Sequence, residues 1–258
     1  MFPILIFIVI LLFFSIYIYK RIKRNRNRFQ NIPDTWHNLL LSHVLFYKKL
    51  PFKNQQLHFR EKMSFFLSET HVESINFKLE ELDVVLVAAS AVIPVFYFED
   101  WSYTNLTTVL IYPDHFNEDL EFDGENRNIA GLVGSGRFEN QMILSRKALH
   151  VGFDNKTDKG NTAIHEFVHL IDKMDGRVDG IPKVLLSHSY AIPWLKLVHD
   201  KMEAINNNTS DIRNYAGTNQ EEFFAVASEY FFERPKLFRR KHPKLHKMMK
   251  DCFCNNNV

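Results

Sequence analysis

Two histidines and a glutamate stand at a spacing that can hold a metal ion and activate water. Residues 165–169 read His-Glu-Phe-Val-His, the pattern H-E-x-x-H. On an α-helix, residues four apart lie on one face, so His165 and His169 can bind one zinc ion through their imidazoles. Glu166 points about 100° further round the helix, where it can accept a proton from water instead of binding the metal. The pattern predicts zinc-dependent hydrolysis with Glu166 as the general base. The alternative is a pair of histidines that binds no metal.

A catalytic zinc ion needs a third protein ligand, and Glu222 is the downstream candidate. Thr218 followed three residues later by Glu221 is a capping box, which predicts that a helix starts there. This interpretation assigns Glu221 to backbone capping and leaves Glu222 in the first turn, where it can bind a metal. Glu229, seven residues further on, either orients a zinc-bound histidine through its second ring nitrogen or is an ordinary surface residue.

Tyr215 lies just before this predicted helix and carries a phenolic hydroxyl. Hydrolysis of a peptide bond passes through a tetrahedral oxyanion, which needs a hydrogen-bond donor besides the metal. Tyr215 can supply that donor. The alternative is an ordinary half-buried aromatic residue, one of nine tyrosines in the chain.

The segment that carries the two histidines has the pattern of an amphipathic helix. Asn161 or Thr162 can cap its start, and Asp175-Gly176 and Asp179-Gly180 are turn signals that end it. The histidines lie on a different stripe from the apolar residues, so the helix is expected to pack with one side and to offer its imidazoles on another. The apolar stripe at i, i+3, i+4 and i+7 consists of Ile164, Phe167, Val168 and Ile171.

These motifs, with their neighbours, resemble the Mlc titration factor A family of zinc metallopeptidases. The resemblance covers about residues 50–250 and implies a zincin-like fold. It implies a peptide or protein substrate and one zinc ion per chain, bound by His165, His169 and Glu222. It also implies that Glu166 is the general base and that Tyr215 stabilises the transition state. The Tyr-x6-Glu-Phe-Phe-Ala run is similar to the catalytic domain of anthrax lethal factor as well. The matching segments are 165–172, 175–182 and 215–232, with 88–95 and 109–116 upstream.

The chain departs from this family at one position. Bacterial titration factors carry a histidine upstream of the H-E-x-x-H helix that can bind the metal in a resting form. Between Phe116 and His165 this chain has only His150, which is too close to the helix to match. No residue identifies a regulatory protein partner.

The N-terminus predicts a membrane anchor. Residues 1–19 are uncharged and mostly apolar, and as a helix they span roughly 28 Å, close to the thickness of a bilayer core. Six lysines and arginines follow within residues 20–28. A cleaved secretion signal has the opposite order of charge and apolar run, whereas the positive-inside rule places everything after residue 20 in the cytoplasm. The alternative, a basic nucleic-acid-binding arm, leaves the apolar run unexplained.

Composition predicts one domain on this anchor. The chain has 258 residues and a net charge of only +2, which argues against a nucleic-acid-binding surface. We expect an anchor at 1–19, a basic linker at 20–32, a metallopeptidase domain at 33–250 and a flexible tail at 251–258. Cys252 and Cys254 are too close together for a relaxed disulfide framework and suit a reducing cytosol. A metal-binding Cys-x-Cys pair is the alternative to incidental cysteines.

Periodicity predicts an α+β fold that is mostly helical with a small sheet. The glycine-rich stretch 131–136 is either a connecting loop or a lid. Metallopeptidases often place an edge strand beside the cleft to pair with extended substrate, and either predicted strand suits that role. Strands are expected at 107–112 and 140–145, and helices at 36–46, 55–67, 79–93, 194–205 and 235–249.

The sequence therefore predicts a single-pass, cytoplasm-facing zinc peptidase. The alternative is a tethered regulatory protein that keeps zinc as a structural ion and acts by binding a partner. The residues at 166 and 215 favour the enzyme, because a binding protein has no use for a base beside a metal.

Overall fold

The computed structural model describes Ser15 and residues 32–134, 136–154, 158–177, 179–181, 185 and 191–254. The predicted anchor at 1–19 and the predicted linker at 20–32 lie outside the described residues, apart from Ser15 and Ile32. Within the described ranges, no helix combines the length and the apolar character needed to cross a bilayer.

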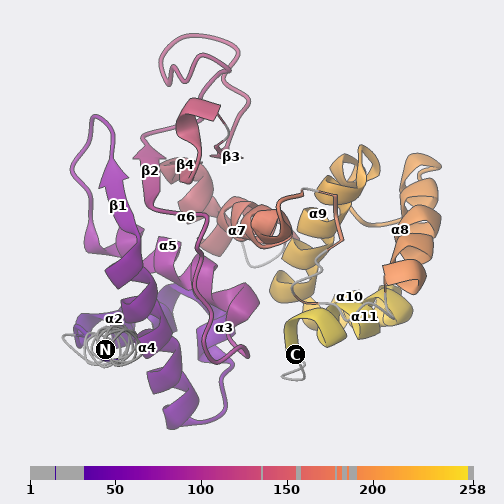
Figure 1. Cartoon of the computed structure of the whole chain (residues 1–258), viewed down its shortest axis with the longest axis horizontal. Coiled ribbons are helices and arrows are strands. Elements are labelled where there is room, and N and C mark those ends of the chain that lie inside the picture. The colour runs from indigo at the N-terminus through magenta and orange to yellow at the C-terminus, as the bar shows by residue number, and fades with distance from the viewer. Residues whose placement is uncertain are drawn as a thin grey trace, which may run out of the picture.

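A four-stranded sheet forms one part of the fold (Figure 1). Its strand order is β1-β2-β4-β3, where β1 and β2 are parallel, β2 and β4 are parallel, and β3 runs antiparallel to β4. The register pairs Ile111 with Leu144 and Leu132 with Ile143. The strands are β1 (His71–Ser74), β2 (Thr108–Tyr112), β3 (Gly131–Val133) and β4 (Gln141–Ser145).

Helices form most of the rest of the described chain, which confirms the expected α+β class. The N-terminal group is α2 (Thr35–His43), α3 (Leu45–Lys48), α4 (Lys53–Glu69), α5 (Glu81–Val92) and α6 (Arg146–Asp154). The C-terminal group is α7 (Thr162–Asp172), α8 (Ala191–Asn206), α9 (Gln220–Glu233), α10 (Pro235–Lys241) and α11 (Pro243–Cys254). Short 3-10 turns are η1 (Ile93–Val95), η2 (Gly136–Phe138), η3 (Lys173–Asp175) and η5 (Asn214–Gly217).

Helix α7 lies at the centre, between the sheet with its N-terminal helices on one side and α8–α11 on the other (Figure 1). It packs against α5, α6, β3 and α9. Its predicted apolar stripe is fully buried, so this helix is held on several sides by the core. That central place makes α7 a fixed platform for the histidines that it carries.

The predicted strands are present, but their place in the sheet corrects the edge-strand prediction. Both β2 and β4 are interior strands, so neither offers a free edge. The edge beside α7 is β3, whose residues the sequence assigned to a glycine-rich loop or lid. Three residues are too few to show the alternation that identifies a strand, and its pairing with β4 is a tertiary contact. The sequence patterns also did not predict β1 or α6.

Two of the predicted helices are each divided into two shorter helices. The helix expected at 36–46 is interrupted at Val44, whose backbone is extended (φ −104°, ψ 98°). The helix expected at 235–249 is two helices, because Pro243 has no N–H to continue α10 and instead starts α11. Helix α11 then runs to Cys254, past the predicted domain end at residue 250, and buries the free thiol of Cys252.

Gly180 joins three elements of the C-terminal half. Its N–H donates to Oδ2 of Asp172 at the end of α7 (2.8 Å), and its carbonyl accepts from Nε1 of Trp194 in α8 (2.7 Å). Its φ is +69°, and a Cβ here would lie 2.3 Å from the carbonyl oxygen of Gln220 at the start of α9. Only glycine allows the backbones to approach this closely at positive φ.

We expect Gly180→Ala to destabilise the protein more than Gly176→Ala. Gly176 also has positive φ, but a Cβ there meets no atom within 4 Å, so its cost is conformational, about 1–2 kcal/mol. At Gly180 the clash with the Gln220 backbone adds roughly 1–3 kcal/mol. Chemical denaturation of both variants measures the difference, and equal destabilisation would contradict the close contact.

Candidate metal centre

The two histidines are presented by the helix that the sequence predicts. Asn161 is the N-cap of α7, and its Oδ1 accepts a hydrogen bond from the backbone N–H of Ile164 at 3.2 Å. His165 and His169 are one turn apart and nearly buried, and their rings meet edge to face with centroids 4.6 Å apart. Their Nε2 atoms face each other at 2.9 Å.

Helix α9 positions Glu222, although its cap differs from the predicted one. The N-cap is Asn219, whose Oδ1 accepts from the N–H of Glu222 at 2.8 Å, and Thr218 donates back to the Tyr215 carbonyl instead. The predicted capping box of Thr218 and Glu221 is therefore wrong by one residue, because asparagine caps at least as well as threonine. Glu222 still lies in the first turn, as expected.

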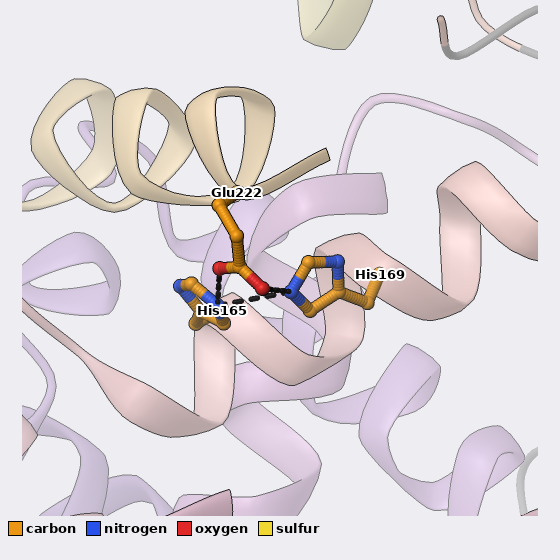
Figure 2. A group of neighbouring side chains, drawn as sticks. All are labelled: His165, His169 and Glu222. Atoms are coloured by element: carbon orange, nitrogen blue, oxygen red, sulfur yellow. Dashed lines mark hydrogen bonds and ion pairs between the residues drawn. The ribbon is translucent and has the colours of Figure 1, made fainter. Parts of the chain in front are cut away.

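The three predicted ligands meet in space (Figure 2). Glu222 Oε2 lies 3.0 Å from Nε2 of His165, and its Oε1 lies 3.6 Å from Nε2 of His169. One donor atom from each residue lies within 4.8 Å of the other two. The packing of α7 on α9 thus brings together two imidazoles and a carboxylate from segments more than fifty residues apart.

Glu229, for which the sequence left two roles open, is a buried residue directly behind His165. It is 1% exposed, and its Oε1 accepts a hydrogen bond from Nδ1 of His165 at 2.7 Å. The backbone N–H of Asn161 donates to its Oε2, and the guanidinium of Arg213 donates to Oε1. A neutral His165 that donates through Nδ1 keeps its Nε2 lone pair for the ligand cluster. The contact with His165 that the orienting role requires is present, and the surface role is wrong.

The donor set fits a divalent metal. Metal bonds of about 2.0–2.2 Å in a tetrahedral arrangement require ligand atoms roughly 3.3 Å apart, and the three observed separations lie between 2.9 and 3.6 Å. Burial alone would raise the pKa of Glu222, but hydrogen bonds from His165 and His169 lower it, so this carboxylate is ionised. Burial likewise opposes a charge on His165, yet the carboxylates of Glu229 and Glu222 raise its pKa. A metal cation can replace the proton that these carboxylates attract.

Glu166 lies beside this cluster but not within it. Its carboxylate faces a pocket of about 410 Å³ between α7, the chain before and at the start of β3, and the segment around η5. Burial raises the pKa of Glu166 above its usual value, although the two histidines oppose the shift. A buried carboxylate with a raised pKa is suited to accepting and returning a proton.

The edge strand β3 touches Glu166 directly. A Cβ on Gly131 would lie 2.7 Å from Cγ and 2.8 Å from Oε1 of Glu166. The strand backbone therefore forms a wall of the pocket beside Glu166. Any side chain at position 131 would displace the Glu166 side chain. The sequence predicts a loop or a lid here and not this contact, because the close approach depends on how the sheet packs on α7.

Tyr215 lines the same pocket from η5. Its ring stacks near His165 with centroids 6.1 Å apart, and 54% of the residue is exposed. Burial of the hydroxyl and the negative charge of Glu222 raise its pKa to about 12, so the phenol stays protonated at neutral pH. It is available as a hydrogen-bond donor at the open side of the cluster.

His150 plays no part in the ligand cluster. Its Nε2 lies 2.6 Å from Oδ1 of the buried Asp83, which also accepts from Arg146. This agrees with the expectation that His150 does not match the upstream histidine of bacterial titration factors.

Arg213 and Asn161 both contact Glu229, and the sequence predicted neither contact. Arg213 lines the pocket and binds Glu229, but nothing in its sequence neighbourhood marks it except Tyr215 two residues later. Asn161 was predicted only as a helix cap. Its second role, donating to Glu229, arises because α9 crosses the N-terminus of α7.

Fold and site together define a metallopeptidase-like protein: an α+β domain with an H-E-x-x-H helix and a third carboxylate from a second helix. A model of the family described as "Glucose-regulated metallo-peptidase M90" matches residues 19–254, and the chain belongs to this family. Family membership implies a divalent metal and confirms the resemblance to the Mlc titration factor A family.

Relatives support this assignment. A protein of Synechocystis named "Uncharacterized protein slr2042" is 28% identical over 253 residues, which cover 90% of this chain and 88% of the relative. Mlc titration factor A of Cronobacter sakazakii is 30% identical over 182 residues, covering 66% and 67%. The protein of the same name from Salmonella arizonae is 33% identical over 153 residues, covering 53% and 58%.

We expect Glu229→Gln to weaken metal binding about 10–100-fold, as loss of a carboxylate that orients a ligating histidine does. Glu233→Gln is the matched control. Glu233 is also a largely buried carboxyl on α9, one turn further on, but it contacts Asn161 and not the histidines. Competition with a chromophoric chelator measures both affinities. The same affinity in both variants would show that Glu229 does not support the metal.

Proposed function

We propose that this chain is a zinc peptidase that hydrolyses peptide bonds. The observation that carries the proposal is the convergence of His165, His169 and Glu222, with the buried carboxylate of Glu166 beside them and outside the ligand cluster. His165, His169 and Glu222 would hold one zinc ion per chain. When bound, zinc polarises the scissile carbonyl and lowers the pKa of water, so that water attacks near neutral pH.

Glu166 does the proton transfer in this proposal. Its carboxylate takes the proton of the attacking water and then gives it to the leaving amine. The burial that raises its pKa favours the first step, because it makes the carboxylate a stronger base. Gly131 leaves room for this carboxylate, because a Cβ there would lie 2.8 Å from its Oε1.

Tyr215 stabilises the charge that develops on the carbonyl oxygen. Its raised pKa keeps the hydroxyl protonated, and its place in the pocket wall lets it donate to an oxyanion. The free edge of β3 offers backbone N–H and C=O groups with which an extended substrate can pair. The proposed substrate is therefore a peptide or an exposed segment of a protein.

A second candidate function rests on the names of the relatives. Several are called titration factors, which describes binding of another protein and not catalysis. In this reading, zinc is structural and the chain sequesters a regulatory partner. The pocket beside Glu166 favours the peptidase, because a structural metal site needs neither a buried base nor an open side.

We expect Glu166→Gln to keep its zinc and lose nearly all peptide hydrolysis, because an amide of the same shape cannot accept the proton. Tyr215→Phe should keep zinc and KM while kcat falls about 10²–10³-fold, the usual loss for one oxyanion donor. Metal content and turnover of a peptide library, with and without a chelator, measure both effects.

Glu221→Gln is the control for these variants, since this acidic residue of the first turn of α9 bonds to Asn219 and not to the metal ligands. It should retain wild-type turnover. Equal peptidase activity in wild type and Glu166→Gln would refute the mechanism, and absence of activity in the zinc-loaded wild type would favour the binding protein.

We also propose that residues 1–19 anchor the domain to a membrane and that the domain faces the cytoplasm. The support is the sequence alone: an uncharged apolar run of bilayer length followed by six cations.

We expect the full chain to remain with membranes after an alkaline carbonate wash and the chain without residues 1–28 to remain in solution with its zinc bound. The core and the residues that pack against it begin at Ile32, so the truncation removes no packing contact of the described fold. Fractionation and metal analysis test this. Aggregation of the truncated chain, with a stable full chain in detergent, would show that the segment belongs to the fold.

A further inference from the structure

The two C-terminal helices carry a concentration of positive charge. Residues 234–250 contain eight lysines and arginines and no acidic residue. The chain as a whole has 32 basic and 30 acidic residues, so its near-neutral net charge hides a strong segregation. Seven of these side chains are exposed, and we call them the basic face: Lys236, Arg239, Arg240, Lys241, Lys244, Lys247 and Lys250.

The basic face is fixed in the fold and not part of a loose tail. Helices α10 and α11 lie together beneath α9, at the end of the molecule away from the sheet (Figure 1). Their opposite side is buried in the core through Phe238, Leu245, Met249 and Phe253. The cations are thus held on the outside of a packed helical pair.

A pocket of about 390 Å³ opens where α10 begins. Lys49, Arg234, Lys236 and Arg240 line it, and its one acidic lining residue is Glu233. Burial raises the pKa of Glu233 to about 7, so its charge is only partial at neutral pH and does not balance four cations. The lysine at position 49 has a lowered pKa, chiefly from burial, with a contribution from the neighbouring cations. The pocket is therefore an attractive site for an anionic group.

We infer that the basic face docks on the surface of an anionic phospholipid bilayer and that this pocket receives a phosphate-bearing headgroup. Clustered lysines and arginines near a membrane are attracted to the negative charge of acidic lipids.

Nucleic acid fits this surface less well than a bilayer. Proteins that bind single strands stack bases on exposed aromatic rings, but the one phenylalanine, tyrosine or tryptophan within residues 234–250 is Phe238, which is fully buried. Outside the basic face and the N-terminal basic run, acidic residues outnumber basic ones, so a long polyanion wrapped over the domain would be repelled. A bilayer touches only the basic end.

Docking would also orient the catalytic pocket. Glu222 and Glu233 lie at opposite ends of α9, eleven residues and about 16 Å apart along its axis. With the pocket near Glu233 on the bilayer, the cluster at Glu222 lies at the far end and remains open to substrate. The inference builds on the proposed anchor, because residues 20–32 span at most about 45 Å and keep the domain within reach of the lipid.

The test uses the full chain reconstituted into vesicles of phosphatidylcholine, alone or with phosphatidylserine. An amine-reactive reagent labels exposed lysines, and mass spectrometry gives the labelling rate at each. We expect Lys236, Lys241, Lys244, Lys247 and Lys250 to be labelled several-fold more slowly in the anionic vesicles, whereas Lys78 and Lys147 keep their rates. One molar salt should abolish the protection, since the Debye length falls to about 3 Å.

Charge reversal supplies matched variants. Arg240→Glu with Lys244→Glu should remove the protection of Lys241 and Lys250, whereas Lys78→Glu with Lys147→Glu changes the net charge equally and should leave it intact. All four side chains are exposed, so folding is spared. Flotation of the chain with pure phosphatidylcholine vesicles tests the anchor separately.

Three outcomes would overturn the inference. Equal labelling rates in both kinds of vesicle would show that the face does not touch lipid. Full protection by inorganic phosphate in detergent would indicate a site for a soluble anion. Stronger protection by RNA or by polyglutamate than by anionic vesicles would assign the face to a nucleic acid or to an acidic protein.

Discussion

The buried carboxylate of Glu229 is the interaction on which the site depends. It lies between α7 and α9 with 1% of its surface exposed, and an ionised group there is stable only if it is fully paired. His165, Asn161 and Arg213 donate to it. Through these bonds, Glu229 holds Asn161 at the start of α7, the candidate metal ligand His165, and Arg213 of the pocket wall. The contact that packs α7 against α9 is therefore also the contact that orients the His165 ring.

Close backbone contacts set the remaining geometry. Gly131 allows the edge of β3 to touch Glu166, and Gly180 allows the chain after α7 to touch the first residue of α9. The first contact fixes the proposed base, and the second fixes the helix that carries Glu222. Two short segments without regular helical structure thus hold the chemistry in place, while the long helices supply the core around it.

The charge distribution gives the domain two different ends. The end of α9 that carries Glu222 meets the two histidines of α7, and the other end lies at the pocket lined by the cations of α10. A peptidase attached to a surface benefits from this separation, because the group that binds the surface does not cover the site that binds substrate. Net charge alone hides this polarity, since opposite charges at different places cancel in the sum.

The sequence by itself determined the helix of His165 and His169, the start of that helix at residue 161 or 162, the first-turn place of Glu222 and the presence of strands β2 and β4. These features depend on neighbours within one or two turns, and local spacing records them. Tertiary structure alone decided that Glu229 is buried behind His165, that Arg213 binds it and that β3 is the edge strand. Those contacts join segments far apart in the chain, and spacing along a sequence holds no record of which distant surfaces pack together.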